Sequence, residues 1–388
     1  MLRLVALSAA GLLGILAARR ALFMAAAMWP RAVDGAPDEQ PALLVVLAAR
    51  DEQGGVGRAL DALDRIDYSR ARLHVALVDD CSTDATPELL RGYAETRPHV
   101  RVVTRHGTPN KAASLNGAIA ASPPFELVVV CDADQTPAPD SFRRLAGAFK
   151  EPEVGAAAAY LRPGNADASM VARYTAVETW VHQLVTSAAK NRLGLDPPML
   201  GGGSMYRREA LEQIGGFPEG VYSEDLGSSL LLTRAGWRTR FVRQAVVDNL
   251  VAGGWRDYWD QHQRWTRSFY QAPAPPPSTA ELSARRRIEL ALQRAGYLDR
   301  IVLGVALVLA ATGRMRPSLP AGYAGVVAAE IALAVAKAGA GRRLPRFLLA
   351  TAVVFPLDAI GALVAAVNHV THRPLNWRSP RRTTDRGG

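Results

Sequence analysis

Apolar and polar positions divide the chain into a central region of short alternating segments and two longer apolar ends. In the central region, short continuous apolar runs that are typical of buried strands alternate with segments of helical periodicity. The expected strands are 43–48, 74–78, 100–104, 126–130 and 154–160, and the expected helices between them are 57–66, 86–93, 112–121 and 139–149. This alternation predicts an α/β fold with a mostly parallel sheet that is covered by helices on both faces.

The pattern changes after residue 160 but still mixes helices and strands. A long helical stretch is expected over 168–193, and a helix that bears three tryptophans is expected near 255–265. Between them we expect a glycine-rich strand and a second strand, at 201–207 and 239–247. The proline-rich sequence QAPAPPPS ends this region, so we predict one domain over 41–270.

The N-terminal segment 1–30 is apolar and has only three charged residues. It could be a signal peptide, but it is long and no convincing cleavage site follows it, so we expect an uncleaved membrane anchor. Arg19, Arg20 and Arg31 follow the apolar part and place that side in the cytoplasm. A turn-rich linker over 30–41 then leads into the domain.

The C-terminal region 280–370 is expected to form membrane helices, and a basic tail covers 371–388. Its three apolar runs are 298–312, 319–340 and 347–370. The first run is short for a span, which needs about 20 residues. If it lies in the interface, the positive-inside rule favours a cytoplasmic tail, a cytoplasmic loop at Arg314 and an external loop at Arg342. If all three runs cross, the tail is external.

Composition and charge narrow the classes of partner. The chain has 46 basic and 36 acidic residues, which leaves a net charge of +10. That excess suits anionic lipid as well as nucleic acid, but no basic patch is interleaved with aromatic residues, so we expect no nucleic-acid partner. The only cysteines, Cys81 and Cys131, follow predicted strands and are expected to be free and to serve as small buried filler.

Two pairs of carboxylates follow predicted strands, where open parallel sheets bind their ligands. Asp79 and Asp80 can accept hydrogen bonds from a nucleobase or ribose, although the following Ser82 also suits a helix cap. Asp132 and Asp134 end another strand, and residues i and i+2 of an extended segment point to the same side. Two such oxygen donors suit Mg²⁺ or Mn²⁺ that bridges a diphosphate.

Two further motifs offer catalytic and binding groups. Glu224 and Asp225 follow a glycine-rich region and can supply a general base, or the acidic first turn of a helix. Gln261, Arg264 and Trp265 share one helix face through their i, i+3, i+4 spacing. The arginine suits phosphate binding, and the tryptophan offers a flat surface to a sugar ring.

Taken together and in this order, these motifs resemble family 2 glycosyltransferases, which are inverting enzymes of the GT-A fold. The resemblance covers about residues 41–270, and its most specific part is similar to the QxxRW signature of the membrane-bound branch, which includes poly-N-acetylglucosamine, chitin, hyaluronan and cellulose synthases. The matching segments are 48–52, 79–84, 110–111, 115–116, 132–134, 215–217, 224–225 and 261–265. Two positions depart from the family pattern: Cys81 stands where the family usually has Gly, and Asp51 where it usually has Asn.

The resemblance implies a role for each motif. Asp225 would deprotonate the acceptor hydroxyl, and Asp79 or Asp80 would hold the uridine. Asp132 and Asp134 would hold Mg²⁺ or Mn²⁺ on the diphosphate. The other residues expected to bind donor or acceptor are Ala49, Glu52, Lys111, Gly203, Glu224, Gln261, Arg264 and Trp265.

The expected function is therefore transfer of a sugar from a UDP-sugar, of the UDP-GlcNAc or UDP-Glc class, at the cytoplasmic face of a cell (inner) membrane. A polysaccharide or glycan acceptor is favoured by the QxxRW match. A membrane lipid of the ceramide, hopanoid or carotenoid type is favoured by the small membrane region. A nucleotidyltransferase of similar fold would not need Asp225 or Trp265, and a scaffold with a decayed site would not keep the acidic motifs.

Overall fold

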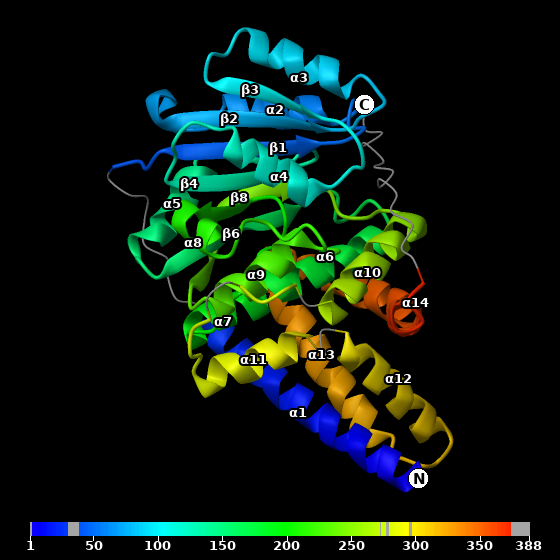
Figure 1. Ribbon diagram of the computed structural model, residues 1–388. Coiled ribbons are helices and arrows are strands. Elements are labelled where there is room, and N and C mark those ends of the chain that lie inside the picture. The colour runs from blue at the N-terminus through cyan, green and yellow to red at the C-terminus, as the bar shows by residue number, and fades with distance from the viewer. Residues whose placement is uncertain (1, 30–38, 272, 277–278, 295–296, 374–388) are drawn as a thin grey trace.

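The computed structural model describes residues 2–29, 39–271, 273–276, 279–294 and 297–373. Most of the predicted linker, part of the proline-rich break and the basic tail beyond residue 373 lie outside the described residues. A sheet domain occupies one side of the molecule, and helices from both ends of the chain extend away from it (Figure 1).

One eight-stranded, mostly parallel sheet organises the domain, in the order β3-β2-β1-β4-β7-β6-β8-β5. The first four strands in this order are parallel, whereas β7 is antiparallel to both of its neighbours and β5 is antiparallel to β8. The strands are β1 (Leu43–Ala49), β2 (Leu73–Asp80), β3 (Val100–Arg105), β4 (Leu127–Asp132), β5 (Thr136–Pro137), β6 (Val154–Pro163), β7 (Ser204–Arg207) and β8 (Arg238–Asn249).

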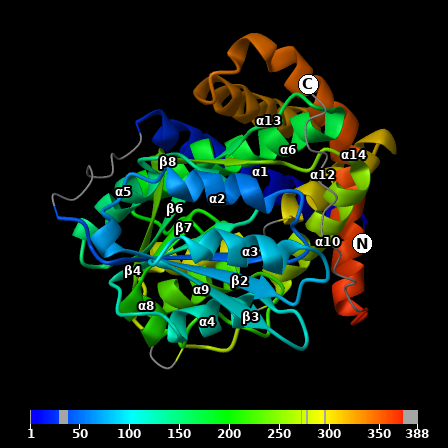
Figure 2. The same ribbon diagram turned by 90° about the horizontal axis from the view of Figure 1, so that it is seen from above.

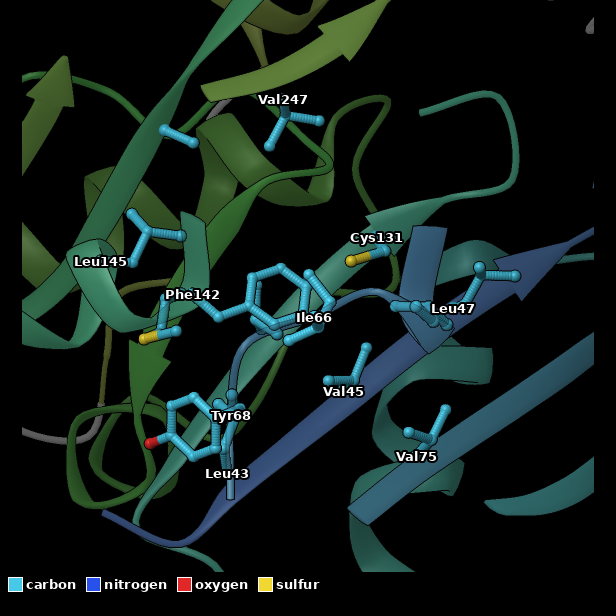
Figure 3. Close-up of a cluster of buried hydrophobic side chains, with 14 of the residues drawn as sticks. Leu43, Val45, Leu47, Ile66, Tyr68, Val75, Cys131, Phe142, Leu145 and Val247 are labelled. Atoms are coloured by element: carbon cyan, nitrogen blue, oxygen red, sulfur yellow. The ribbon is translucent and has the colours of Figure 1, made fainter. Parts of the chain in front are cut away.

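Both faces of the sheet are buried, which explains why its strands are continuous apolar runs. Leu43, Val45 and Leu47 of β1 point into one hydrophobic core, shown in Figure 3, whereas Leu44 and Val46 point into a second core on the opposite face. Successive strand residues alternate between the two faces of a sheet. When helices cover both faces, every position of the strand is buried and is therefore apolar.

Helices from the intervening segments cover the two faces. The first core is covered by α2 (Val56–Asp64), α3 (Thr86–Glu95) and α5 (Ser141–Ala146), and the second by α4 (Lys111–Ala120), α8 (Arg208–Gln213) and α9 (Glu224–Arg234). These elements agree with the expected α/β alternation. The remaining helices of this region are α6 (Met170–Trp180), α7 (Ala188–Leu193), α10 (Trp255–Tyr270) and α11 (Ala284–Arg294).

Two predicted elements differ in detail from the structure. The glycine-rich strand begins only at Ser204, because Gly201 and Gly203 have φ near +75° and form a turn before β7. The expected helix over 168–193 is continuous but contains a π-helical segment, Val181–Ser187, between α6 and α7. Such segments are rare and often lie at functional sites.

The apolar ends of the chain form long helices. These are α1 (Leu2–Met28), α12 (Leu298–Ala311), α13 (Ser318–Lys337) and α14 (Leu344–Val370). Within the described part of the chain, three helical segments are long and apolar enough to cross a membrane, namely Arg3–Met28, Ser318–Lys337 and Gly341–Val370. The protein is therefore equipped for membrane association, and α12 is too short to qualify, as expected.

The loops between these helices lie at opposite ends of the bundle, but not as the basic residues predicted. Arg343 pairs with Asp167 of the sheet domain, so the loop beside Arg342 lies on the domain side. Met315, next to Arg314, packs in a cluster with Ala9, near the start of α1 and far from the domain. The loop beside Arg342, rather than the one beside Arg314, is therefore on the domain side, which differs from the arrangement expected if the first apolar run lies in the interface.

Candidate active site

A single cavity of about 1000 Å³ opens at the carboxyl ends of β1, β2 and β4. One wall comes from the turns that follow these strands, and another from the start of α9 and from α10. The cavity also reaches α1, α12, α13 and α14. It therefore joins the ligand-binding edge of the sheet to the helices from the two ends of the chain.

A lysine joins two acidic motifs at the centre of the cavity. The Nζ of Lys111, at the start of α4, lies 2.7 Å from Oδ1 of Asp132 and 3.0 Å from Oε1 of Glu224. Burial lowers the pKa of Lys111, but the charges of Asp132 and Glu224 outweigh burial and raise that pKa above its ordinary value. Lys111 is therefore a permanent cation between the carboxylates.

The glycine turn before β7 brings backbone against these carboxylates. The amide of Gly202 donates to Oδ2 of Asp132 at 3.1 Å. A side chain on Gly202 would lie 1.9 Å from Gln135, and one on Gly201 would lie about 3.5 Å from both Asp132 and Asp225. Glycine is favoured at Gly201 by its positive φ of 75°, and at Gly202 because a side chain would collide with Gln135 and with the backbone of Asp132.

Asp225 has the features of a proton acceptor. Burial, followed by the charge of Glu224, raises the pKa of Asp225 to about 6. Its carboxylate accepts from the Ser223 hydroxyl and from the backbone N–H of Leu226, the latter at 2.7 Å. The second contact means that Asp225 also stabilises the start of α9, and its role as a general base stays a prediction.

The turns after β1 and β2 hold each other through their own side chains. Asp51 accepts from the backbone N–H of Thr83 at 2.7 Å, and Ser82 accepts from the N–H of Asp51 at 3.1 Å. Asp51 and Cys81 both have positive φ, of 53° and 62°. This backbone region favours Gly and Asn, which accounts for the Asn and Gly that the family usually has at these two positions; the Asp and Cys of this chain adopt the same conformation at a cost.

Comparison with known proteins identifies the family. Residues 41–268 match the profile described as "Glycosyltransferase like family 2". The chain belongs to the family 2 glycosyltransferases. A solved mannosyltransferase from Pyrobaculum calidifontis, in complex with GDP-Man and Mn²⁺, has the same fold, with a TM-score of 0.65, 24% identity and coverage of 96% of this chain and all of that one.

Curated relatives are similar over the same region. A beta-monoglucosyldiacylglycerol synthase of Synechocystis is 27% identical over 233 residues, which cover 60% of this chain and 48% of that protein. An N-acetylglucosaminyltransferase of Rhizobium meliloti is 28% identical over 242 residues, which cover 60% of this chain and 56% of that protein. The chain thus spans about half the length of the curated relatives that it matches.

The glycosyltransferase presents its QxxRW segment to the cavity from α10. Gln261, Arg264 and Trp265 all line the cavity, as their helical spacing predicts. The Oε1 atom of Gln261 is buried and has no hydrogen-bond partner among the described residues. An unpaired buried acceptor is costly, so this atom is available to a bound ligand.

The other face of α10 is held by a buried group of charges that the sequence did not reveal. The Nδ1 atom of His262 lies 3.0 Å from the Tyr258 carbonyl oxygen, and its Nε2 atom lies 3.0 Å from Oε2 of Glu178. Burial lowers the pKa of His262, but the charge of Glu178 and its hydrogen bond outweigh burial and raise that pKa above its ordinary value. Arg300 of α12 then pairs with both Glu178 and Asp358.

This buried quartet, defined as Glu178, His262, Arg300 and Asp358, balances its own charge. Three of its members could in principle ligate a metal. However, Arg300 pairs with both carboxylates, at 2.6 Å from Glu178, and its positive charge occupies the position that a metal ion would need. The quartet therefore joins helices rather than holding a metal. No pattern in a single sequence signals it, because its four members lie on four different helices.

The structure brings most of the predicted site residues to one cavity. Those that line it are Ala49, Glu52, Asp80, Lys111, Asp132, Asp134, Glu224, Asp225, Gln261, Arg264 and Trp265. Asp79 does not line it, since it is 2% exposed and its Oδ1 accepts from the backbone of Ser82. Gly203 does not line the cavity either, because it packs against Leu161 and Val247. The glycines that adjoin the carboxylates are Gly201 and Gly202.

Proposed function

We propose that this glycosyltransferase transfers a sugar, with inversion, from a UDP-sugar to a hydroxyl of a membrane lipid at the cytoplasmic face of a cell membrane. The observation that supports a lipid acceptor most directly is the continuity of the cavity. The same cavity that holds Asp132 and Asp225 is lined farther along by Leu12 and Leu16 of α1 and by Phe355 of α14. Charged residues such as Arg20, Asp299 and Glu330 line the same part of the cavity, so an acceptor with a polar head and apolar chains would find partners for both.

The donor half of the cavity suits a nucleoside diphosphate. Asp80 ends β2 beside Arg105, which holds its Oδ1 at 2.8 Å, so the carboxylate is fixed for a contact with base or ribose. Arg264 and Lys111 supply positive charge for the diphosphate and its developing negative charge. Gln261 adds its unpaired oxygen.

The carboxylates also fit a divalent cation, which the family implies. Asp132, Asp134, Glu224 and Asp225 line one cavity, and Lys111 alone does not neutralise them. Asp132 and Asp134 would hold Mg²⁺ or Mn²⁺. The metal supplies charge neutralisation to the leaving diphosphate. We expect EDTA to abolish transfer and Mn²⁺ or Mg²⁺ to restore it; undiminished transfer in chelator would remove the metal from the proposal.

Within the transfer step, Asp225 takes the proton from the acceptor hydroxyl. That oxygen bonds to the anomeric carbon of the sugar, while the bond from this carbon to the diphosphate oxygen breaks. Attack and departure on opposite sides of one carbon invert its configuration. Trp265, beside Gln261 and Arg264 on the wall of the cavity, would stack against the acceptor sugar or against an apolar chain.

A glycan acceptor is the second candidate. The QxxRW match favours it, because that signature is typical of processive enzymes, and some relatives, such as the Rhizobium meliloti protein, are named N-acetylglucosaminyltransferases. The Synechocystis relative is named a beta-monoglucosyldiacylglycerol synthase, which accords with a lipid acceptor. The relatives alone therefore do not decide between the two.

The deciding experiment incubates membranes that contain the protein with radiolabelled UDP-Glc, UDP-GlcNAc and GDP-Man, and then separates lipid from polymer products. We expect label from a UDP-sugar in the organic phase. Label in a water-soluble polymer would favour the glycan acceptor, and transfer from GDP-Man alone would overturn the UDP preference. The Asp225→Asn variant is the control for transfer by other enzymes in the membrane.

A further inference from the structure

Both ends of α14 contact the same side of the sheet domain. At its start, Arg343 pairs with Asp167, and the ring of Phe347 packs edge-on against Trp180, with centroids 5.0 Å apart. At its end, the carbonyl of Arg373 accepts from Arg267 at 2.9 Å. Trp180 and Arg267 belong to α6 and α10, which both lie within the family domain.

The middle of α14 is held by the same two domain helices. Asp358 accepts from the hydroxyl of Tyr174 of α6 at 2.8 Å, and the carbonyl of Gly361 accepts from Gln263 of α10 at 2.8 Å. An α-helix of 27 residues is about 40 Å long. A helix of that length that crosses a bilayer has ends on opposite sides of about 30 Å of hydrocarbon, so it cannot touch one aqueous domain along its whole length.

The directions of the helices agree with these contacts. In Figure 1, α1 and α13 run away from the sheet, whereas α14 is seen nearly end-on beside α10. In the view from above, α14 is seen along its length at the edge of the domain (Figure 2). It therefore runs across the direction of α1 and α13 rather than beside them.

The exposed face of α14 is apolar and its buried face contains an acidic residue, which is the opposite of what a helix exposed to water normally shows. Its buried face contains its only acidic residue, Asp358, together with small residues against α6 and α10. Its exposed face is apolar along its length: the residues are Leu349, Val353, Leu357, Ile360, Leu363, Val367 and Val370, each at least 44% exposed. A helix face turned to water is normally polar, so this face requires an apolar partner.

We propose that α14 lies in the plane of the membrane surface beneath the sheet domain and does not cross the bilayer, with its exposed apolar face in the lipid. Basic residues at both ends, Arg342, Arg343 and Arg346 at one and Arg373 at the other, would meet anionic head groups, as interfacial helices do. The helices that remain long and apolar enough to cross are then α1 and α13, and α14 sets the depth at which the active site meets the lipid.

The test measures depth directly by spin labelling of the full-length protein in lipid vesicles. Single cysteines replace Leu349, Leu357, Leu363 and Val370 in a Cys81→Gly, Cys131→Ser background. Accessibility to oxygen and to a nickel chelate gives the depth of each label. We expect one shallow depth for all four labels. Cysteines at Leu319, Ala324, Ala329 and Ala336 on the exposed positions of α13 are the matched control and should be deepest in the middle.

Two results would overturn the proposal. One is a depth profile on α14 that peaks in the middle of the helix, as expected for α13. The other is shielding of the α14 labels from oxygen by a second copy of the chain. Neither result depends on the sugar or the acceptor, so the proposal can fail while the proposed function stands, and the reverse also holds.

Discussion

At the scale of single residues, the acidic groups of the cavity differ in their surroundings, and this separates their roles. Asp132 is in contact with the cation Lys111, whereas Asp225 is buried beside another carboxylate. A carboxyl group whose pKa is raised toward the working pH is a better proton acceptor. The environment, rather than the residue type, therefore supports the proposed role of Asp225 as the base.

Replacement of this base should separate chemistry from binding. Asp225→Asn keeps the size and hydrogen-bonding capacity of the side chain but cannot take a proton, so we expect transfer to fall by about 10²–10⁴-fold. UDP affinity, measured by calorimetry, should change little. Arg264→Ala is the matched contrast, because loss of a charged phosphate contact should weaken UDP binding as well.

The raised pKa of Asp225 also predicts the pH dependence. The carboxyl group must be ionised to act, so transfer should decline as the pH falls through about 6, and the decline should approach tenfold per pH unit below that value. A profile of kcat/KM against pH measures this limb. Near wild-type transfer by Asp225→Asn, or no acidic limb above pH 5, would leave Asp225 only as part of the start of α9.

Backbone strain gives a residue-scale prediction that does not involve activity. Cys81 has φ of 62°, a conformation that costs a side-chain-bearing residue roughly 1–2 kcal/mol. Cys81→Gly should therefore raise the free energy of unfolding by about 0.5–1 kcal/mol after the entropic cost of glycine, seen as a higher Tm in detergent. Cys131→Gly, in the buried strand β4, is the control and should lower Tm; a lower Tm for Cys81→Gly as well would contradict the argument.

At the scale of elements, α10 connects the catalytic cavity to the helices from the C-terminal end of the chain. One face presents Gln261, Arg264 and Trp265, and the opposite face meets Glu178 through His262 and α14 through Gln263. The orientation of the ligand-binding face thus depends on contacts that other residues of α10 make with α6 and α14. The short sequence motif needs a distant partner to be placed correctly.

This arrangement predicts that His262 acts on the donor through Arg264. We expect His262→Ala to weaken UDP affinity by roughly tenfold, and to have little further effect in an Arg264→Ala background, which a double-mutant cycle measures by calorimetry. Asp196→Asn, which disrupts another buried carboxylate with two arginine partners, is the control for loss of packing. Additive effects of His262→Ala and Arg264→Ala would mean that the two residues act independently.

At the scale of the whole molecule, the sheet domain and the terminal helices share their hydrophobic cores. Phe23 and Ala27 of α1 pack in one cluster with Trp180 of the domain and with Phe347 of α14. A second cluster joins Tyr258 to Val354. The domain is therefore not an independent unit that is merely tethered to the membrane.

Removal of the terminal helices should accordingly damage the domain. A fragment of residues 39–276 would expose the shared clusters to water, so we expect aggregation, or a UDP affinity at least tenfold weaker than that of the full-length protein. Size-exclusion chromatography and calorimetry measure the two outcomes. A monodisperse fragment with the full-length affinity for UDP would show that the terminal helices serve only as anchors.

The sequence by itself determined the α/β alternation, the positions of most strands and eleven of the residues that line the cavity. It could do so because these features are local: a strand buried on both faces is a continuous apolar run, and the motifs follow strand ends that meet at one edge. The sequence showed Asp51 and Cys81 only as departures from the family pattern, and their positive φ came from the structure.

Only the tertiary structure decided which glycines adjoin the carboxylates, why Asp79 is excluded from the cavity, and how α14 lies against the domain. Each depends on contacts between segments that are far apart in the chain, such as Gln263 with Gly361 or Arg343 with Asp167. Hydropathy measures the affinity of a helix for lipid but not its direction. The direction comes from packing, and packing is set by partners that periodicity and composition do not contain.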